Sequence, residues 1–146
     1  MALLKKTLIA VGGLAVLGVG GFFALGVASQ GGSAPGLVDG RLAPCPSSPN
    51  CVSSEEGTDP EKSVEAMPAE AWEQLPELIA TMGGTVTEAS EAYLAAEFKS
   101  STFGFVDDVE FRLAEDGIHV RSASRVGYSD AGVNAQRVSD IRSALR

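Results

Sequence analysis

The sequence has few of the residues that bind metal ions and nucleic acids. It contains two cysteines and one histidine, which are too few for a four-ligand zinc site built from these side chains. Its 11 basic residues are outnumbered by 19 acidic ones, whereas a protein that neutralises phosphates needs a basic surface. We therefore expect no metal site and no nucleic-acid partner, and we expect no cofactor.

Charge is also absent from a long segment near the N-terminus. Residues 7–29 carry no charged side chain, and this is about the length that a helix needs to cross a hydrocarbon core roughly 30 Å thick. Lys5 and Lys6 precede the segment and the next basic residue is Arg41, so the positive-inside rule places the N-terminus in the cytoplasm. We predict that residues 1–29 are a transmembrane anchor or an uncleaved signal. The protein would then be a single-pass protein of the bacterial inner membrane with a periplasmic C-terminal domain. Cleavage after the small residues 27–29 is the alternative to a retained anchor.

The rest of the chain divides into a linker and one domain. Residues 30–41 are rich in Gly and Ser and contain a proline, a composition that predicts a flexible linker. Residues 42–146 are enough for a single domain with a modest core.

The pattern of apolar residues in this domain predicts an α+β fold. Pro68 and the acidic residues after it are typical of a helix start, and Gly83 should end this helix, with Pro76 kinking or splitting it. Alternating apolar and polar residues predict strands near residues 85–89, 93–99, 105–113 and 118–121. An apolar stripe predicts a last helix over residues 133–145. We expect an antiparallel sheet of three to four strands flanked by two helices.

The same alternation places several charged side chains together on the outer face of the sheet. Asp108 and Glu110 lie on one strand of a predicted hairpin, and His119 and Arg121 lie on the other. Paired carboxylates can share acid and base roles, but a solvent-exposed lattice of cross-strand ion pairs is the interpretation that we favour. If another segment covered this face, the buried charges would instead indicate a polar ligand pocket.

The two cysteines lie in a proline-rich loop predicted over residues 41–56. Cys45 and Cys51 are separated by five residues, two of them prolines, in a part of the chain that we expect to lie in an oxidising compartment. A structural disulfide is the favoured interpretation. A reactive redox pair and metal ligation are the alternatives.

A dense run of hydrogen-bonding side chains lies where the last predicted strand meets the last helix. Such a junction can bind an anion through a helix N-terminus and guanidinium groups. Alternatively, its polar residues cap the helix and its arginines pair with the acidic strand. The candidate ligand-binding residues are Arg121, Ser124, Arg125, Tyr128, Ser129, Asp130, Asn134 and Arg137.

Three blocks of the sequence resemble a protein family. They are residues 44–54 (PCPSSPNCVSS), 105–113 (FVDDVEFRL) and 118–138 (IHVRSASRVGYSDAGVNAQRV). They are similar to the family of bacterial and plastid proteins called domain of unknown function 1499, from about Leu42 to the end of the chain. Pro76 departs from the family pattern, whose helix usually runs unbroken there. The resemblance implies a fold and an exported or membrane-linked setting, and it implies no activity.

Together these features favour binding over catalysis. We expect a membrane-anchored envelope module, held in the membrane through residues 7–29, that binds an envelope protein or a small polar ligand. The alternative is an enzyme that uses Asp108, Glu110 and His119 as acid–base groups. The two differ in burial, because an enzyme needs these groups in a concave, partly dry site with shifted pKa values.

Overall fold

The domain is built on one antiparallel sheet of five strands in the order β3-β7-β6-β5-β4. The computed structural model describes residues 18–145, so residues 1–17 of the predicted anchor lie outside the described residues. The strands are β3 (Cys51–Ser53), β4 (Thr85–Ala89), β5 (Tyr93–Lys99), β6 (Val106–Ala114) and β7 (Gly117–Ser124). The α+β class and the antiparallel sheet are confirmed.

The sheet has one strand more than the sequence predicted. Residues 41–56 were predicted to be loop throughout, and this is wrong for Cys51–Ser53, which pairs with β7 through Cys51↔Ala123 and Ser53↔Arg121. The three prolines of this region all precede Cys51, so the backbone N–H groups of β3 are free to join the ladder. A small second sheet pairs β1 (Leu37–Val38) with β2 (Arg41–Leu42).

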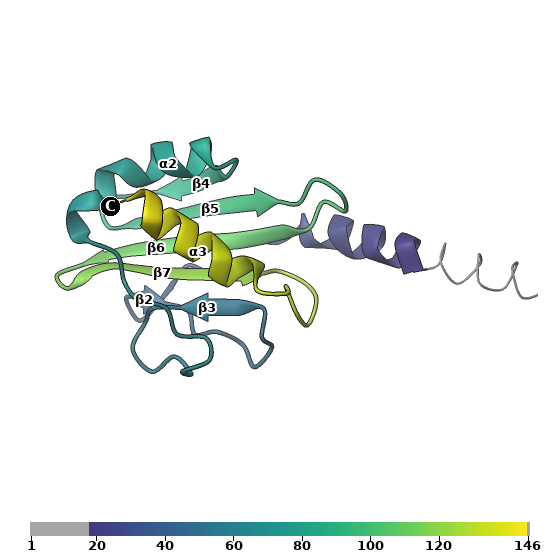
Figure 1. Ribbon diagram of the computed structural model, residues 1–146, viewed down its shortest axis with the longest axis horizontal. Helices are drawn as coiled ribbons and strands as arrows, with labels where there is room; N and C mark the ends of the chain where they lie inside the picture. Colours follow the sequence, from purple (N-terminus) through teal and green to yellow (C-terminus); the bar gives the residue numbers. More distant parts are fainter. Residues whose placement is uncertain (1–17, 146) are drawn as a thin grey trace, which may run out of the picture.

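The helices cover one face of the large sheet (Figure 1). Pro76 splits the first predicted helix as expected, into the 3-10 helix η1 (Ala69–Gln74) and the α-helix α2 (Leu75–Thr81). The last helix, α3 (Val133–Ala144), also lies where it was predicted. A further helix over residues 18–29, the N-terminal helix, projects away from the domain (Figure 1). Among the described residues no helix is long and apolar enough to cross a membrane.

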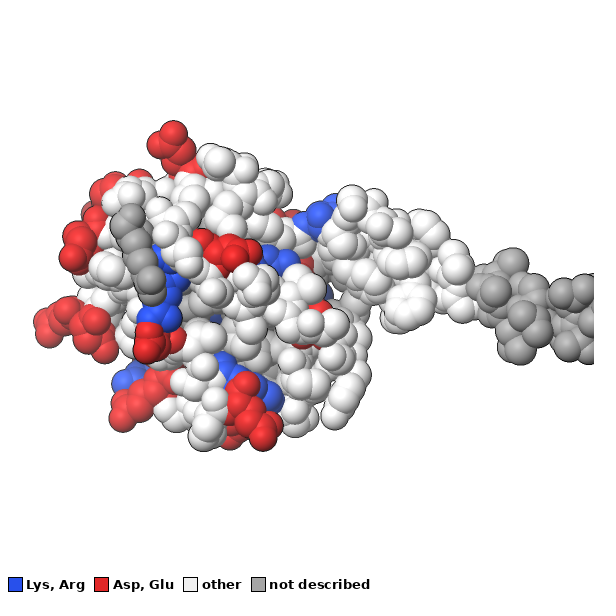
Figure 2. Space-filling model, viewed as in Figure 1, with Lys and Arg blue, Asp and Glu red and all other residues white. Residues whose placement is uncertain are grey.

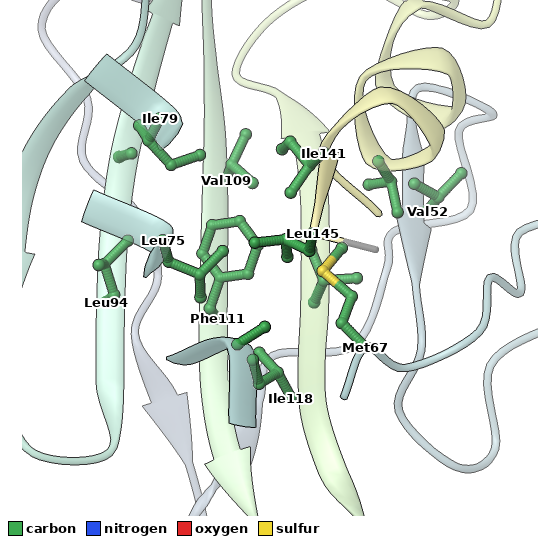
Figure 3. Close-up of a cluster of buried hydrophobic side chains, with 14 residues drawn as sticks. Val52, Met67, Leu75, Ile79, Leu94, Val109, Phe111, Ile118, Ile141 and Leu145 are labelled. Carbon is green, nitrogen blue, oxygen red and sulfur yellow. The ribbon is translucent and has the colours of Figure 1, made fainter. Parts of the chain in front are cut away.

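The main core lies between the sheet and these helices (Figure 3). Alternation along the strands decides which side chains enter it, because successive residues point to opposite faces. Val109 and Phe111 of β6 and Ile118 and Val120 of β7 are fully buried there, as predicted. Leu75, Ile79 and Ile141 from the helices fill the space above them.

The opposite face of the sheet is covered by chain that precedes β3. Residues 30–41, predicted to be a flexible linker, lie against this face, where the N–H of Gly36 donates to Glu110 Oε1 at 2.8 Å. Leu42 packs with Tyr93 and Ala95 of β5 in a second, smaller apolar cluster. The charged face that was expected to be open to solvent is therefore enclosed.

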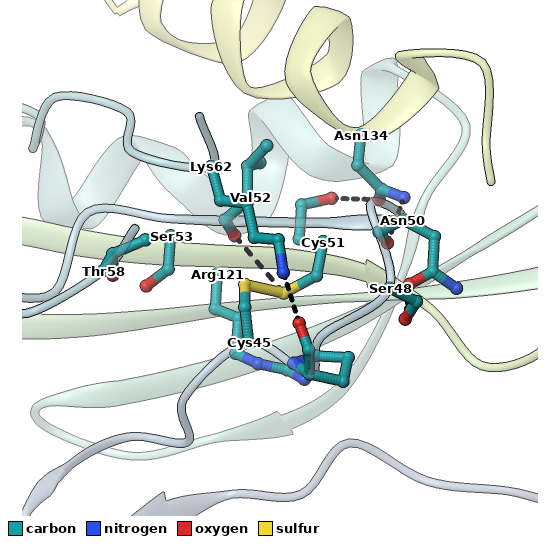
Figure 4. Close-up of a disulfide and its surroundings, with 12 residues drawn as sticks. Cys45, Ser48, Asn50, Cys51, Val52, Ser53, Thr58, Lys62, Arg121 and Asn134 are labelled. Carbon is teal, nitrogen blue, oxygen red and sulfur yellow. Dashed lines mark hydrogen bonds between the residues drawn. A yellow bond between two sulfur atoms is a disulfide. The ribbon is translucent and has the colours of Figure 1, made fainter. Parts of the chain in front are cut away.

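The predicted disulfide between Cys45 and Cys51 is present, and no cysteine is free. Its Cα atoms are 5.7 Å apart. Figure 4 shows it at the start of β3, where it fixes the proline-containing loop to the edge of the sheet. Lys62 also holds this loop, because its Nζ donates to the carbonyl of Pro46, which lies between the two cysteines.

Replacing both cysteines by serine should lower the free energy of unfolding by about 2 kcal/mol, because the short crosslink restricts the unfolded chain. The measurement is urea denaturation of the full chain in mild detergent. A reductant should destabilise the wild type by a similar amount and leave the double serine variant unchanged. Equal stability of oxidised wild type and double variant would contradict this expectation.

Candidate functional site

The enclosed polar face of the sheet contains the charged residues that the sequence singled out. Glu110 is fully buried, and Asp108 and Arg121 are 4% and 7% exposed. The cross-strand ion pairs were predicted correctly, since Glu110 lies opposite Arg121 in the register of β6 and β7. The prediction that they are solvated is wrong, because residues 29–44 cover them and the sequence of the strands does not reveal that cover.

Glu110 is held by three donors. Tyr93 Oη and the N–H of Gly36 donate to Oε1 at 2.8 Å each, and Arg121 Nη1 donates to Oε2 at 3.1 Å. Burial raises the pKa of Glu110, although these three donors act in the opposite direction. Burial and the adjacent carboxylate also raise the pKa of Tyr93 well above its usual value. The hydroxyl therefore stays protonated and serves as a donor.

Arg125 connects the polar face to the end of the N-terminal helix. Its Nε and Nη2 donate to the two carboxylate oxygens of Asp108 at 2.8 and 2.7 Å. Nη2 also contacts Glu97, and Nη1 donates to the carbonyl of Ser29 at 3.2 Å. The hydrogen bonds that it donates to Asp108, and then those that it donates to Glu97, raise the pKa of this guanidinium against the effect of burial.

His119 lies apart from the two strand carboxylates. Its Nδ1 is 3.2 Å from the carbonyl of Ser54, and its Nε2 is 3.1 Å from Asp116. Between β6 and β7, His119 lies opposite Arg112, which binds both carboxylate oxygens of Glu55. No hydrogen bond in the described part of the chain joins His119 to Asp108 or Glu110. The three proposed acid–base groups therefore do not form one hydrogen-bonded unit.

The strand-to-helix junction is also largely engaged in internal contacts. Asn134 is fully buried and accepts from Ser122 Oγ at 2.6 Å and from Arg137 Nη1 at 2.7 Å. Arg137 also binds Asp107 at 2.7 Å and lies over the ring of Phe98. Ser124 Oγ accepts from the Asn134 amide at 3.0 Å. These contacts match the capping and pairing interpretation of the junction, and they leave its role in ligand binding a prediction.

Asp130 organises the start of α3. Its two carboxylate oxygens accept from the N–H of Gly132 at 3.1 Å and from the N–H of Asn134 at 2.7 Å. These hydrogen bonds outweigh burial and lower the pKa of Asp130. Next to it, Tyr128 is 77% exposed and Ser129 is exposed. Of the eight candidate residues, these two keep the most contact with solvent.

An open cavity of about 430 Å³ lies beside Tyr128 and Ser129, between the N-terminal helix and the start of α3. We call it the junction cleft. Its apolar lining comes from Phe22, Leu25, Phe105, Val106, Val126 and Val133. No local pattern in the sequence predicts this cleft, because Phe22 and Leu25 lie more than 100 residues before Val126 and Val133 and only the packing of the N-terminal helix brings them together.

A sequence model of one family, described as "Protein of unknown function (DUF1499)", matches residues 41–145. The chain belongs to this family. No curated protein and no solved structure shows a significant match. The match begins at β2 and runs through α3, so the DUF1499 region includes the whole large sheet. The N-terminal helix, and with it one wall of the junction cleft, lies before the matched residues.

Among residues 18–145, no group of three or more His, Cys, Asp or Glu side chains could hold a metal ion.

Two contributors to the polar face were not among the predicted site residues. Glu55 comes from the loop after β3, and Tyr93 comes from β5. Alternation along residues 93–99 places Tyr93 on the face opposite Leu94, so that part of its position can be found from the sequence. Its bond to Glu110 depends on the pairing of β5 with β6.

Acid should destabilise the DUF1499 domain partly through Glu55. Burial opposes ionisation of this carboxylate, but hydrogen bonds from Arg112 and the N–H of Leu42 outweigh burial and lower its pKa. The ionised group therefore stabilises the fold fully above the unfolded pKa of about 4.3, and this contribution disappears as the pH falls through the folded pKa. Urea midpoints measured between about pH 6 and pH 2 should fall less steeply for Glu55→Gln than for wild type. Glu56→Gln is the control, because Glu56 is exposed; parallel curves for all three would contradict the assignment.

Arg125→Ala should lower the free energy of unfolding by about 3–5 kcal/mol, because it leaves the buried Asp108 without its partner. Arg41→Ala is the matched control, since its pair with Glu56 is exposed and worth at most about 1 kcal/mol. Adding Asp108→Ala to Arg125→Ala should cost less than the sum of the two single changes. If Arg125→Ala were as stable as wild type, the guanidinium would be available to a ligand rather than committed to the fold.

Proposed function

We propose that this DUF1499 protein is a single-pass, membrane-anchored domain of the bacterial envelope that binds a ligand at its membrane-facing end and catalyses no reaction. One observation carries this proposal. The candidate acid–base groups are buried and paired inside the domain, whereas the junction cleft is open and mostly apolar. Binding sites for small molecules are typically concave and apolar with a few polar groups.

The distribution of charge supports an orientation with the N-terminal helix toward the membrane. In Figure 2 most of the visible Asp and Glu side chains lie away from this helix, and basic side chains lie where the helix joins the domain. The strand connections agree, because Glu115 and Asp116 form the β6–β7 turn, at the opposite end of the antiparallel hairpins from the β5–β6 turn that contacts the helix. An acidic end would be repelled by anionic headgroups.

The compartment is supported by the disulfide and by the uncharged segment. Disulfides persist in oxidising compartments and are rare in the cytosol. Residues 7–29 are uncharged and Lys5 and Lys6 precede them, which favours a cytoplasmic N-terminus and an extracytoplasmic domain. The enzyme alternative needs a shared, accessible site for Asp108, Glu110 and His119. Its support is weaker, because Glu110 is fully buried and the three groups have separate partners.

The orientation can be tested with single accessible cysteines in the full chain. Glu115→Cys should react with a membrane-impermeant maleimide in intact spheroplasts, because Glu115 is exposed in the β6–β7 turn, far from the N-terminal helix. Ala2→Cys should react only after permeabilisation. Both variants should remain in the pellet after alkaline extraction, as expected of a retained anchor. Labelling of Ala2→Cys but not Glu115→Cys in intact spheroplasts, or release of the chain by alkali, would overturn the proposal.

A further inference from the structure

The N-terminal helix is packed against the β5–β6 turn through aromatic rings. Phe103 lies 5.4 Å from Phe22 and 5.1 Å from Phe23 between ring centroids, and Phe105 lies 6.3 Å from Phe22. Gly26 makes this contact possible, because a Cβ at that position would lie 1.8 Å from the carbonyl oxygen of Phe103. We call Phe22, Phe23, Phe103 and Phe105 the phenylalanine cluster.

Polar contacts fix the end of the same helix to the domain. The buried hydroxyl of Ser29 accepts from the N–H of Val106 at 3.0 Å. Gln30 donates to the carbonyl of Gly104 at 3.2 Å and accepts from Lys99 at 2.9 Å. With the bond from Arg125 to the Ser29 carbonyl, these contacts set the direction in which the helix leaves the domain. The N-terminal helix and the domain therefore have a defined relative orientation.

This orientation sets the depth of the junction cleft relative to the bilayer. A helix needs about 20 residues to cross the hydrocarbon core. A span that starts at Thr7, the first residue of the uncharged segment, therefore ends near Gly26. Phe22 and Leu25 then lie within the outer part of the hydrocarbon. Phe103 and Phe105 contact Phe22, so the tip of the β5–β6 turn lies at the boundary between the headgroups and the hydrocarbon.

The lining of the cleft fits a chain that comes from the bilayer. Phe22 and Leu25 form the wall nearest the lipid, and Val126 and Val133 line the cleft on the side of the domain. The two carboxylates in the lining are already engaged, Asp107 with Arg137 and Asp130 with the start of α3. The residues that line the cleft include no Lys or Arg that could attract a free anion.

The rim of the cleft offers polar groups at the level of the lipid headgroups. Tyr128 is 77% exposed there although its ring is large and partly apolar. Tyrosine is enriched at membrane–water interfaces, where the ring contacts apolar chains and the hydroxyl contacts water or headgroups. Ser129, also exposed, adds a second hydroxyl beside it.

We propose that the junction cleft takes one acyl chain of a phospholipid from the outer leaflet, with the ester region of that lipid at Tyr128 and Ser129. The inference rests on the proposed membrane anchoring and goes beyond it by naming the ligand class and the site. The chain enters between Phe22 and Leu25 on the bilayer side and reaches Val126 and Val133 on the domain side.

The test uses the full chain in nanodiscs of phosphatidylethanolamine and phosphatidylglycerol, with a small fraction of phospholipid that carries a photoreactive diazirine on one acyl chain. After illumination and proteolysis, mass spectrometry locates the crosslinks. Crosslinks within residues 7–21 report anchoring, because these residues precede the lining of the cleft, and crosslinks at Val126 and Val133 report the cleft. Crosslinks in both regions are expected.

Filling the cleft separates a bound chain from contact with a flat membrane surface. Val133→Trp should reduce crosslinking at Val126 about tenfold, the effect of excluding about two methylene groups from the cleft, while crosslinks within residues 7–21 stay unchanged. Tyr128→Glu, at an exposed position, should reduce the same signal without any demand on core packing. Val38→Trp is the size-matched control, because Val38 is half-exposed and lines a different cavity.

Three results would overturn the inference. Crosslinks confined to residues 7–21 would leave the anchoring intact and exclude the acyl-chain site. Equal labelling of Val126 in wild type and in both cleft variants would show surface contact without a bound chain. Labelling by a photoreactive fatty acid in detergent, with none by the phospholipid in nanodiscs, would assign the cleft to free fatty acids. If residues 7–21 were also unlabelled, the proposed anchoring itself would fail.

Discussion

Asp108 on β6 and Arg125 after β7 form a buried ion pair on which several parts of the structure depend. Arg125 also binds Glu97 on β5 and the carbonyl of Ser29 at the end of the N-terminal helix. A single guanidinium therefore holds together the central strands and the end of the N-terminal helix. Burying the two charges costs desolvation energy, and their mutual contact largely offsets it.

The same principle explains why the polar face is structural. On this face Glu110 is paired with Arg121 and Glu55 with Arg112, and on the helix-covered face Asp107 is paired with Arg137. Each pair joins two different elements, so a wrong register would leave buried charges unpaired, at a high cost. We infer that these pairs specify the arrangement of strands and of the covering segment. Groups that are committed in this way are poorly suited to proton transfer with a substrate.

The end of the domain from which the N-terminal helix projects differs from the polar face in both charge and packing. The phenylalanine cluster is apolar and the walls of the junction cleft are mostly apolar, and they meet where the N-terminal helix leaves the domain. The family match begins only at residue 41, so the cleft combines a wall from the DUF1499 domain with a wall from outside it. Its shape thus depends on how this particular chain joins its apolar segment to the domain.

The sequence by itself determined the class of fold, the faces of β5, β6 and β7, the break at Pro76 and the disulfide. These features follow from local rules: the period of a strand, the missing N–H of proline, and the short separation of Cys45 and Cys51. Only the tertiary structure decided that Cys51–Ser53 joins the sheet and that residues 29–44 bury its polar face. It also brought Phe22 next to Phe103 and opened the junction cleft. Such contacts join residues up to about 100 positions apart, and no local period or propensity records them.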